Sequence, residues 1–367
     1  MIYLDHGATT PMRPEVWEAM TPFASQTFGN PSGSHGISRS AKNALEEARE
    51  EAAAILGCRP LEIVFTGGGT EADALAIHGR AGDGGGIVTT VIEHEAVLEC
   101  AASLAARGSH LVAVPVDSQG GIDPEQVAGA VDAATAVVSV MAANNETGSI
   151  LPVRDIAAAV KRRWPDLPIH TDAIQFFVSE DVSVDDLGVD MLSLSAHKFG
   201  GPKGVGLLFV KEGTSLKPLV HGGGQELGRR SGTQNVMGVV GMVAAMRSAV
   251  ADRSRFRSDV FEARRRFEAI LAGVASRTTP AGLIQHSHLR FPGVNNETLV
   301  IRLDQRGLAA STASACQSGA SRVSHVLTAM GYTPQAAREC LRFTFGWNTT
   351  PDEAEQAGRV VLDSLPS

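Results

Sequence analysis

Short apolar runs alternate with amphipathic segments through the first half of the chain. The strand-like apolar runs occupy residues 62–65, 87–91, 110–114, 136–141, 168–171 and 191–194. Segments with helical periodicity occupy residues 40–56, 71–77, 95–107, 124–131 and 153–163. Strands and helices that alternate in this way predict a mostly parallel sheet with helices on both faces. Ser40 is the expected N-cap of the first long helix, and Gly57 is its expected stop.

The second half of the chain has a less regular pattern. Helices expected at 235–251 and 260–271 lead away from the repeated units. After them the pattern predicts strands at 289–291 and 341–345, a short strand before Ser311, and helices at 297–305, 335–340 and 352–365. We therefore expect a large domain of residues 15–250 and a smaller α+β domain formed by residues 1–14 and 251–367.

Polar side chains follow five of the predicted strands. In chain order they are Thr66-Gly-Gly-Gly-Thr70, His94, Asn144-Asn145-Glu146, Asp172 and Lys198. Ligands of open parallel sheets bind beyond the carboxyl ends of the strands. The sequence therefore predicts that these side chains meet at one ligand site.

The stretch from Asp190 to Gly204 joins a buried strand to Ser-Ala-His-Lys and a Gly/Pro loop. A lysine just past a buried strand can be partly desolvated, which lowers the pKa of its amine and makes it a nucleophile toward carbonyl groups. Ser195 and His197 flank Lys198 with hydrogen-bonding groups suited to an anionic ligand. Taken alone, the stretch fits a solvated surface lysine better, because lysines commonly follow strands.

Other candidate residues have two interpretations each. Asp172 would pair with a protonated ring nitrogen or cap the next helix, and Gln175 lies one turn further on. The glycine-rich turn at 66–70 would hold a phosphate on its free backbone N–H groups or be a plain connection. Arg342, in an apolar strand, would bind a substrate carboxylate or form a structural salt bridge.

Composition limits the function classes. A net charge of −8, with 43% hydrophobic and 20% charged residues, is typical of a globular protein and argues against a general nucleic-acid or anionic-membrane surface. No apolar run approaches the length of a membrane span, and the start of the chain has no apolar signal-peptide core. His221-Gly-Gly-Gly resembles an esterase oxyanion loop, but no G-x-S-x-G elbow supplies a serine nucleophile.

Four cysteines, at positions 58, 100, 316 and 340, form neither a C-x-x-C pair nor a zinc-ligand spacing. This scatter fits reduced thiols in the cytoplasm. Cys58, Cys100 and Cys340 lie in apolar or helical patterns that are typical of buried structural cysteines. Cys316 instead has small and polar neighbours, where an exposed thiolate would be a nucleophile.

Motifs spread over nearly the whole chain resemble those of one enzyme family. They are Tyr3-Leu-Asp-His-Gly-Ala-Thr-Thr-Pro, Phe28-Gly-Asn-Pro-Ser, Phe65-Thr-Gly-Gly-Gly-Thr-Glu, Glu93-His94, Asn144-Asn-Glu-Thr-Gly, His170-Thr-Asp-Ala-Ile-Gln175, Ser195-Ala-His-Lys-Phe-Gly-Gly-Pro-Lys-Gly, His221-Gly-Gly-Gly-Gln-Glu, Arg230-Ser-Gly-Thr233, Ser314-Ala-Cys-Gln-Ser and Leu341-Arg-Phe-Thr-Phe-Gly. With them the chain resembles the cysteine desulfurases, class V aminotransferase-like enzymes of the pyridoxal-phosphate fold-type I, in the group that serves iron–sulfur cluster assembly. The resemblance implies an α/β fold-type I transferase with a mostly parallel seven-stranded sheet in the large domain and a smaller α+β C-terminal domain that carries the catalytic cysteine loop.

The resemblance also implies a role for each candidate residue. Lys198 would hold pyridoxal 5'-phosphate as a Schiff base and shuttle the Cα proton, Asp172 would pair with the pyridinium nitrogen, and His94 would stack on the ring and help with the substrate thiol proton. Further cofactor contacts would come from Gly69, Thr70, Asn145, Gln175, Ser195 and His197, with Thr233 reaching in from a second subunit. Asn30, Asn145 and Arg342 would bind the substrate. Ala74 and Thr312-Ala313 depart from the family pattern without removing a catalytic group.

The implied reaction takes sulfur from L-cysteine, releases L-alanine and leaves a persulfide on Cys316. A sulfur-acceptor protein of the iron–sulfur or tRNA-thiolation pathways would then receive the sulfur, and the enzyme would be a cytoplasmic homodimer with shared active sites. No metal site is expected, although Cys316 could also ligate an iron–sulfur cluster. The alternatives are a selenocysteine lyase or another class V lyase or aminotransferase, which would not need Cys316, and a non-catalytic partner protein that kept the fold.

Overall fold

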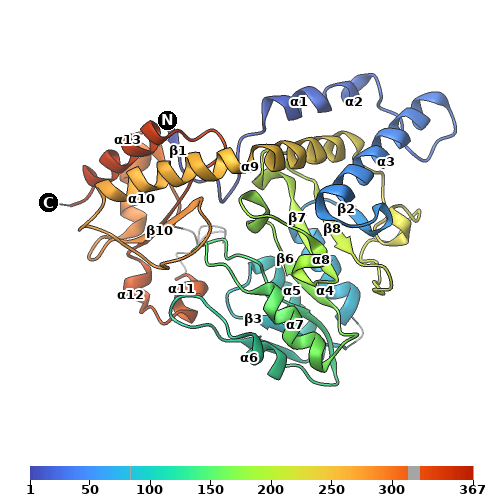
Figure 1. The fold of residues 1–367 in the computed structure, drawn as a ribbon, viewed down its shortest axis with the longest axis horizontal. Coiled ribbons are helices and arrows are strands. Elements are labelled where there is room, and N and C mark those ends of the chain that lie inside the picture. Colours follow the sequence, from blue (N-terminus) through green and yellow to red (C-terminus); the bar gives the residue numbers. More distant parts are fainter. Residues whose placement is uncertain (83, 313–322, 367) are drawn as a thin grey trace.

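A seven-stranded sheet forms the centre of the larger part of the molecule in the computed structural model, which describes residues 1–82, 84–312 and 323–366 (Figure 1). Its strands are β2 (Ile63–Thr66), β3 (Gly86–Thr90), β4 (Leu111–Val114), β5 (Thr135–Ser139), β6 (Ile169–Asp172), β7 (Met191–Ser195) and β8 (Gly206–Val210), in the order β2-β8-β7-β6-β5-β3-β4. Strand β8 is antiparallel to both of its neighbours, β2 and β7, and the other strand pairs of this sheet are parallel, so the predicted mostly parallel sheet is confirmed. The strand β8 itself is an addition to the predicted elements.

Helices cover both faces of this sheet, because alternate strand residues point to opposite sides. On β2, Ile63 and Phe65 join one apolar core, whereas Val64 joins the other. The first core packs against α3 (Gly36–Leu56), α6 (Pro124–Gly129), α7 (Val153–Arg163) and α9 (Val236–Ile270). The second core packs against α4 (Gly69–Ala81) and α5 (Glu95–Ala105). The expected two-sided α/β arrangement is therefore present.

The start of α3 differs from the prediction. His35, not Ser40, is the N-cap, and its ring accepts a hydrogen bond from the backbone N–H of Ser38. Ser40 lies inside the first turns, where its hydroxyl donates to the Gly36 carbonyl. Gly57 ends the helix as predicted, with a left-handed φ of 74°.

The long helix α9 joins the central sheet to the C-terminal part of the chain, as Figure 1 shows. The gap predicted between helices at 235–251 and 260–271 is wrong, since one continuous helix of 35 residues contains both predicted segments almost entirely. Its apolar residues serve two cores: Val243 packs with the central sheet, and Phe267 packs with the C-terminal elements. The proposed domain boundary between residues 250 and 251 thus falls inside α9, and the two-domain division stays a proposal.

A small antiparallel sheet lies in the C-terminal part, close to both chain ends (Figure 1). It consists of β9 (Ser276–Arg277), β10 (His286–Arg290) and β12 (Cys340–Thr344), with α10 (Asn296–Gln305) and α13 (Pro351–Leu362) packed on its core. Strand β1 (Ile2–Tyr3) pairs in parallel with β11 (Leu308–Ala309). Cys340, predicted in a helix, lies in β12, because the preceding helix α12 (Pro334–Ala337) ends earlier.

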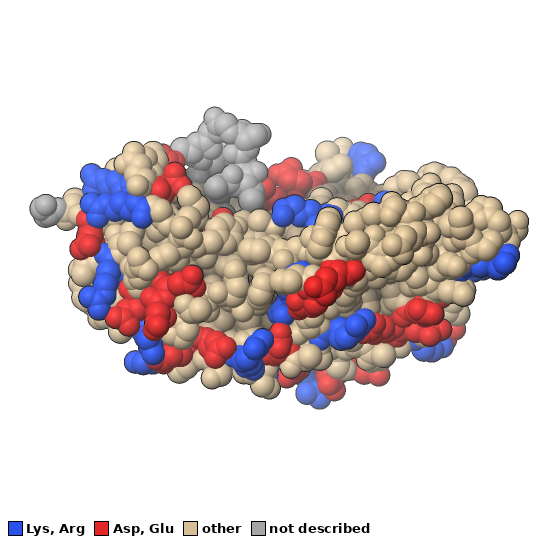
Figure 2. Space-filling model, turned by 90° about the horizontal axis from the view of Figure 1, so that it is seen from above, with Lys and Arg blue, Asp and Glu red and all other residues tan. Residues whose placement is uncertain are grey.

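The remaining elements are short. They are α1 (Pro14–Met20), α2 (Pro22–Ser25), α8 (Val184–Leu187), α11 (His325–Ala329) and the 3-10 turns η1 (Pro60–Glu62), η2 (Phe176–Val178), η3 (Ala196–Lys198) and η4 (Glu226–Gly228). On the face shown in Figure 2, the described acidic and basic side chains are intermixed rather than segregated. Within the described residues, every helix is too short or too polar to cross a lipid bilayer.

A buried ion pair fastens the loop around η4 to the edge of the sheet. Glu226 accepts hydrogen bonds from Arg49 Nη1 and Nη2 at 2.8 and 2.9 Å, and from the backbone N–H of Phe65 at 3.0 Å. Glu226 and Leu227 have φ of 51° and 58°, a left-handed conformation that is unfavourable for residues other than glycine. The ion pair therefore holds a strained turn in place.

Replacing Glu226 by alanine is expected to lower the free energy of unfolding by about 3–5 kcal/mol, because Arg49 would stay buried without its counter-charge. Chemical denaturation followed by circular dichroism measures this change. The control is Glu51→Ala, which removes the partner of the exposed Arg247 and should cost at most about 1 kcal/mol. Equal losses in the two variants would contradict the assignment.

Candidate active site

A cavity of about 230 Å³ opens at the carboxyl ends of the parallel strands. It is lined by the predicted residues Gly69, Thr70, His94, Asn145, Asp172, Gln175, Ser195, His197 and Lys198, together with Ala8, Asp73, Met141, Ala143 and Ile174. Beside it lies a more open cleft of about 670 Å³, which shares Gly69, Thr70, Ser195 and His197 with the cavity. The polar clusters that follow the predicted strands thus meet at one place.

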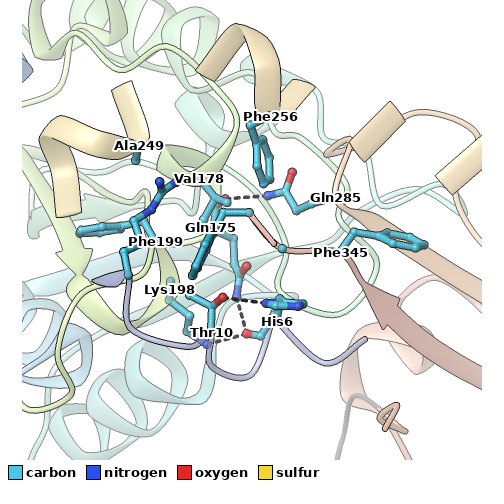
Figure 3. A pocket seen from close by; sticks show the side chains of 14 residues that line it. His6, Thr10, Gln175, Val178, Lys198, Phe199, Ala249, Phe256, Gln285 and Phe345 are labelled. Carbon is cyan, nitrogen blue, oxygen red and sulfur yellow. Dashed lines mark hydrogen bonds between the residues drawn. The ribbon is translucent and has the colours of Figure 1, made fainter. Parts of the chain in front are cut away.

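Lys198 ends η3, directly after β7, and its amine reaches the N-terminal segment of the chain. Its Nζ donates hydrogen bonds to the backbone carbonyls of Gly7 and Ala8, at 2.6 and 2.9 Å. The Gly7 carbonyl also accepts from Gln175 Nε2 at 2.9 Å (Figure 3). Lys198 is therefore a positioned, half-buried amine rather than a freely solvated one.

The N-terminal segment is itself fixed by buried contacts around a second cavity of about 20 Å³ behind Lys198, the one drawn in Figure 3. The Nδ1 atom of His6 lies 2.6 Å from Thr10 Oγ1, and burial lowers the pKa of His6 to about 4. A Cβ atom at Gly346 would lie 2.1 Å from His6 Nδ1, so only glycine fits there. This packing holds the carbonyls that position Lys198.

Asp172 is buried at the end of β6 and faces the cavity. Its Oδ1 atom accepts a hydrogen bond from the backbone N–H of Ile174 at 2.9 Å. Burial raises the pKa of Asp172, and the neighbouring His94 ring and Lys198 amine oppose this rise. A carboxylate in this position can pair with a cationic group of a ligand.

Two histidines in the cavity wall are held in their neutral form. His94 is the N-cap of α5, where its Nδ1 accepts from the Ala96 N–H at 3.0 Å, and burial lowers its pKa. His197 lies 3.2 Å from Thr9 Oγ1, and burial, reinforced by Lys198, lowers its pKa to about 4. A neutral imidazole can stack on a ring, accept a proton or donate a hydrogen bond.

The turn before α4 fits an anion. Gly68 is the N-cap, with a φ of 151° that essentially only glycine adopts and with no side chain to cap the helix. A Cβ atom at Gly69 would lie 2.3 Å from Ile174 Cδ1, so a larger residue would have to displace the Ile174 side chain in the cavity wall. Free N–H groups and the helix dipole of this 13-residue helix favour a phosphate there.

Three of the described predicted site residues do not line the cavity of a single chain, namely Asn30, Thr233 and Arg342. Arg342 Nη2 donates to Asp5 at 2.8 Å, and its Nη1 donates to the Asn145 carbonyl at 2.8 Å, so the structural salt bridge exists. Asn30 is exposed and accepts from the Ser32 N–H, and Thr233 is exposed on the loop after η4. Cys316 lies outside the described residues. Their assigned roles stay predictions.

Two features of the cavity were not predicted. The first is the pair of backbone carbonyls of Gly7 and Ala8, whose contact with Lys198 cannot be predicted from side-chain motifs. Both residues lie in the Tyr3-to-Pro11 stretch that carries the resemblance. Asp73 follows Gly69 by four residues, a spacing that places both on one face of a helix. That spacing is the signal that could have identified it.

The family-model description "Aminotransferase class-V" matches residues 2–356 of this chain. The chain is 40% identical over 365 residues to "Cysteine desulfurase IscS" of Dictyoglomus turgidum, with 96% of this chain and 91% of that protein covered. It is also 40% identical to "Putative cysteine desulfurase IscS 1" of Bacillus subtilis, with coverages of 99% and 98%.

Solved structures with the same fold include a "NifS-like protein", which matches with a TM-score of 0.93 and 37% identity over 99% of this chain and 98% of that one. Another is "SspA in complex with cysteine", with a TM-score of 0.83, 35% identity and coverages of 94% and 99%. Because the family model spans nearly the full length, the chain belongs to the class-V aminotransferase family.

Proposed function

We propose that the protein is a pyridoxal 5'-phosphate-dependent cysteine desulfurase, a sulfurtransferase that converts L-cysteine to L-alanine and passes the sulfur to an acceptor protein. The observation that carries the proposal is the meeting of Lys198, Asp172 and the N-terminus of α4 in one cavity. An amine, a buried carboxylate and an anion site match the aldehyde, ring nitrogen and phosphate of this cofactor. Relatives named cysteine desulfurase, and a relative solved with cysteine, support the substrate.

In this proposal each residue has a physical task. The N-terminus of α4, with Thr70, Ser195 and His197, would hold the phosphate, and Asp172 would supply a negative charge to the ring nitrogen. His94 would contact the ring from the cavity wall and accept or donate the substrate thiol proton. The cofactor supplies an electron sink for negative charge at the substrate Cα. Lys198 takes the proton from that carbon and returns it, because its amine is already held at the cavity wall by the Gly7 carbonyl.

Sulfur transfer is assigned to Cys316. Its thiolate attacks the substrate sulfur, an S–S bond forms, the carbon–sulfur bond breaks, and its electron pair stays with the carbon that becomes the alanine methyl group. Burial raises the pKa of Cys58, Cys100 and Cys340 to about 12, so these thiols do not compete as nucleophiles. Arg342 and Asn30 are proposed to bind the substrate carboxylate, with Asn145 beside them.

We further propose a cytoplasmic homodimer in which Thr233 completes the phosphate site of the second subunit. Thr233 is exposed, and the loop that leads to it exposes Leu219, Val220 and Leu227, which are 38%, 41% and 60% accessible. Exposed apolar side chains next to a site are typical of a subunit contact. The acceptor is proposed to be a protein of the iron–sulfur or tRNA-thiolation pathways.

The test incubates the purified protein with L-cysteine and analyses both products. L-Alanine should accumulate, and mass spectrometry should find one added sulfur atom on the peptide that contains Cys316. Peptides with Cys58, Cys100 and Cys340 serve as internal controls and should carry none. Alanine formed without sulfur on Cys316 would overturn the sulfur-transfer assignment.

A further inference from the structure

Asp73 is a cavity residue for which the proposed mechanism has no use. It lies on α4, one turn after Gly69, and lines the same cavity as Asp172. Its side chain is fully buried, and within the described part of the chain neither carboxyl oxygen has a partner at hydrogen-bond geometry. An ionised carboxylate without partners is costly in such a place, whereas a neutral acid is tolerated.

A row of buried polar side chains crosses the sheet next to Asp73. The ring of His170 lies between two hydroxyls, 2.9 Å from Ser139 Oγ at Nδ1 and 2.9 Å from Ser193 Oγ at Nε2. Asp73 Oδ1 is 3.6 Å from the same Nε2 atom. Because burial lowers the pKa of His170 to about 3, the imidazole is neutral and offers Asp73 no positive charge.

The two acids of the cavity have unequal support for a negative charge. Asp172 has the Ile174 N–H and the positive charge of Lys198. Asp73 has only the nearby Ser193 hydroxyl, while burial, Asp172 and Glu93 raise its pKa well above the usual range. Environments that differ in this way place the charge on one acid and the proton on the other.

We propose that Asp73 is a positioning residue that remains a neutral carboxylic acid, so that the negative charge of the acid pair is held on Asp172. The inference rests on the proposed function, since the charge on Asp172 acts on the reaction only through the cofactor's ring nitrogen. As a neutral acid, Asp73 places no second negative charge near Asp172, and it acts without touching the reacting atoms.

The titratable groups that face Asp73 come from four segments of the chain. They are His170 and Asp172 of β6, Glu93 and His94 between β3 and α5, Cys100 of α5, and Lys198 after β7. Strands β2, β3, β5 and β8, which also contact α4, carry no titratable side chain. Among the described residues, Glu93 is the other acid with no exposed surface, and burial raises its pKa to about 8.

The test compares Asp73→Asn with the wild type as a function of pH. In the unfolded chain the carboxyl releases its proton near pH 4, at its usual pKa of about 3.9, whereas the folded protein keeps it. Above that pH, raising the pH therefore favours unfolding of the wild type, and the asparagine variant lacks this effect. The variant should melt higher than the wild type at about pH 8, on the order of a few degrees, with a smaller difference at about pH 5.

A second readout detects the proton directly. The infrared spectrum of the wild type near neutral pH should contain the C=O band of a protonated carboxyl that Asp73→Asn lacks. Glu93→Gln is the matched control, because it removes the other buried acid and should leave the Asp73 band in place. A melting difference independent of pH, or no infrared band assignable to Asp73, would overturn the inference.

The visible absorbance band of the bound cofactor distinguishes a failure of this inference from a failure of the proposed function. Asp73→Asn should keep the visible absorbance of the holoenzyme near neutral pH, because one neutral group replaces another. Loss of the band in the variant alone would show that Asp73 supplies a needed negative charge, which overturns its assignment as a neutral acid. If the wild type itself lacked the band, both the proposed function and the positioning role of Asp73 would be overturned. The pH dependence of the melting difference would still show whether Asp73 is protonated in the folded protein.

Discussion

Replacing Lys198 by alanine is expected to abolish the visible absorbance of the purified protein and to lower alanine formation from L-cysteine by at least about 10⁴-fold. The variant loses the amine that anchors the cofactor and the base that moves the Cα proton, and a positioned base alone is typically worth about 10²–10⁴-fold. Absorbance spectra and an assay of alanine measure the two effects separately.

The control for this change is Lys211→Ala. Lys211 is exposed just beyond β8, outside the cavity, so its loss should leave spectrum and turnover as in the wild type. Circular dichroism should find both variants folded. Unchanged absorbance and turnover in Lys198→Ala would disprove the assignment of Lys198.

Replacing Asp172 by asparagine is expected to lower turnover by about 10²–10³-fold, the usual value of one positioned electrostatic group. Asparagine keeps an oxygen that can accept from the Ile174 N–H, so the local backbone should hold. It cannot hold the negative charge opposite a protonated ring nitrogen, and the visible band should shift or weaken. Steady-state kinetics and absorbance titration measure these effects.

Asp166→Asn is the matched control, because Asp166 is exposed on the turn before β6 and is not part of the cavity lining. Its turnover should equal that of the wild type. If Asp172→Asn kept full turnover and an unaltered spectrum, a pairing between Asp172 and the cofactor would be ruled out.

Much of the fold follows from local patterns. The segment at 153–163 was predicted with the bounds that α7 has, because its apolar stripe is regular and proline precedes it. Predictions failed where local signals were weak or competed. His35 caps α3 although histidine is not a common cap, and α9 continues through a polar stretch that looks like a gap between two helices. Packing of α9 against both cores stabilises the helix across that stretch.

The candidate site likewise contains residues that the sequence predicted and contacts that it could not predict. Asp172, Lys198 and the turn before α4 were predicted together, because parallel strands bring their carboxyl ends to one edge. The contact of Lys198 with the Gly7 carbonyl joins residues separated by 191 positions, and no periodicity along the chain encodes it. Arg342 had two equal interpretations, and its ion pair with Asp5 across 337 positions became visible only in three dimensions.

The sequence by itself determined the α/β class, the strand ends that carry polar groups and the family resemblance, because these depend on residue type and short spacing. Tertiary structure alone decided which side chains share a cavity, how burial changes their pKa values, and that Asp73 lines the same cavity as Asp172 with neither carboxyl oxygen at hydrogen-bond geometry to another described residue. These properties depend on distance and on the exclusion of water, which arise only when α4, β6 and the N-terminal segment pack together.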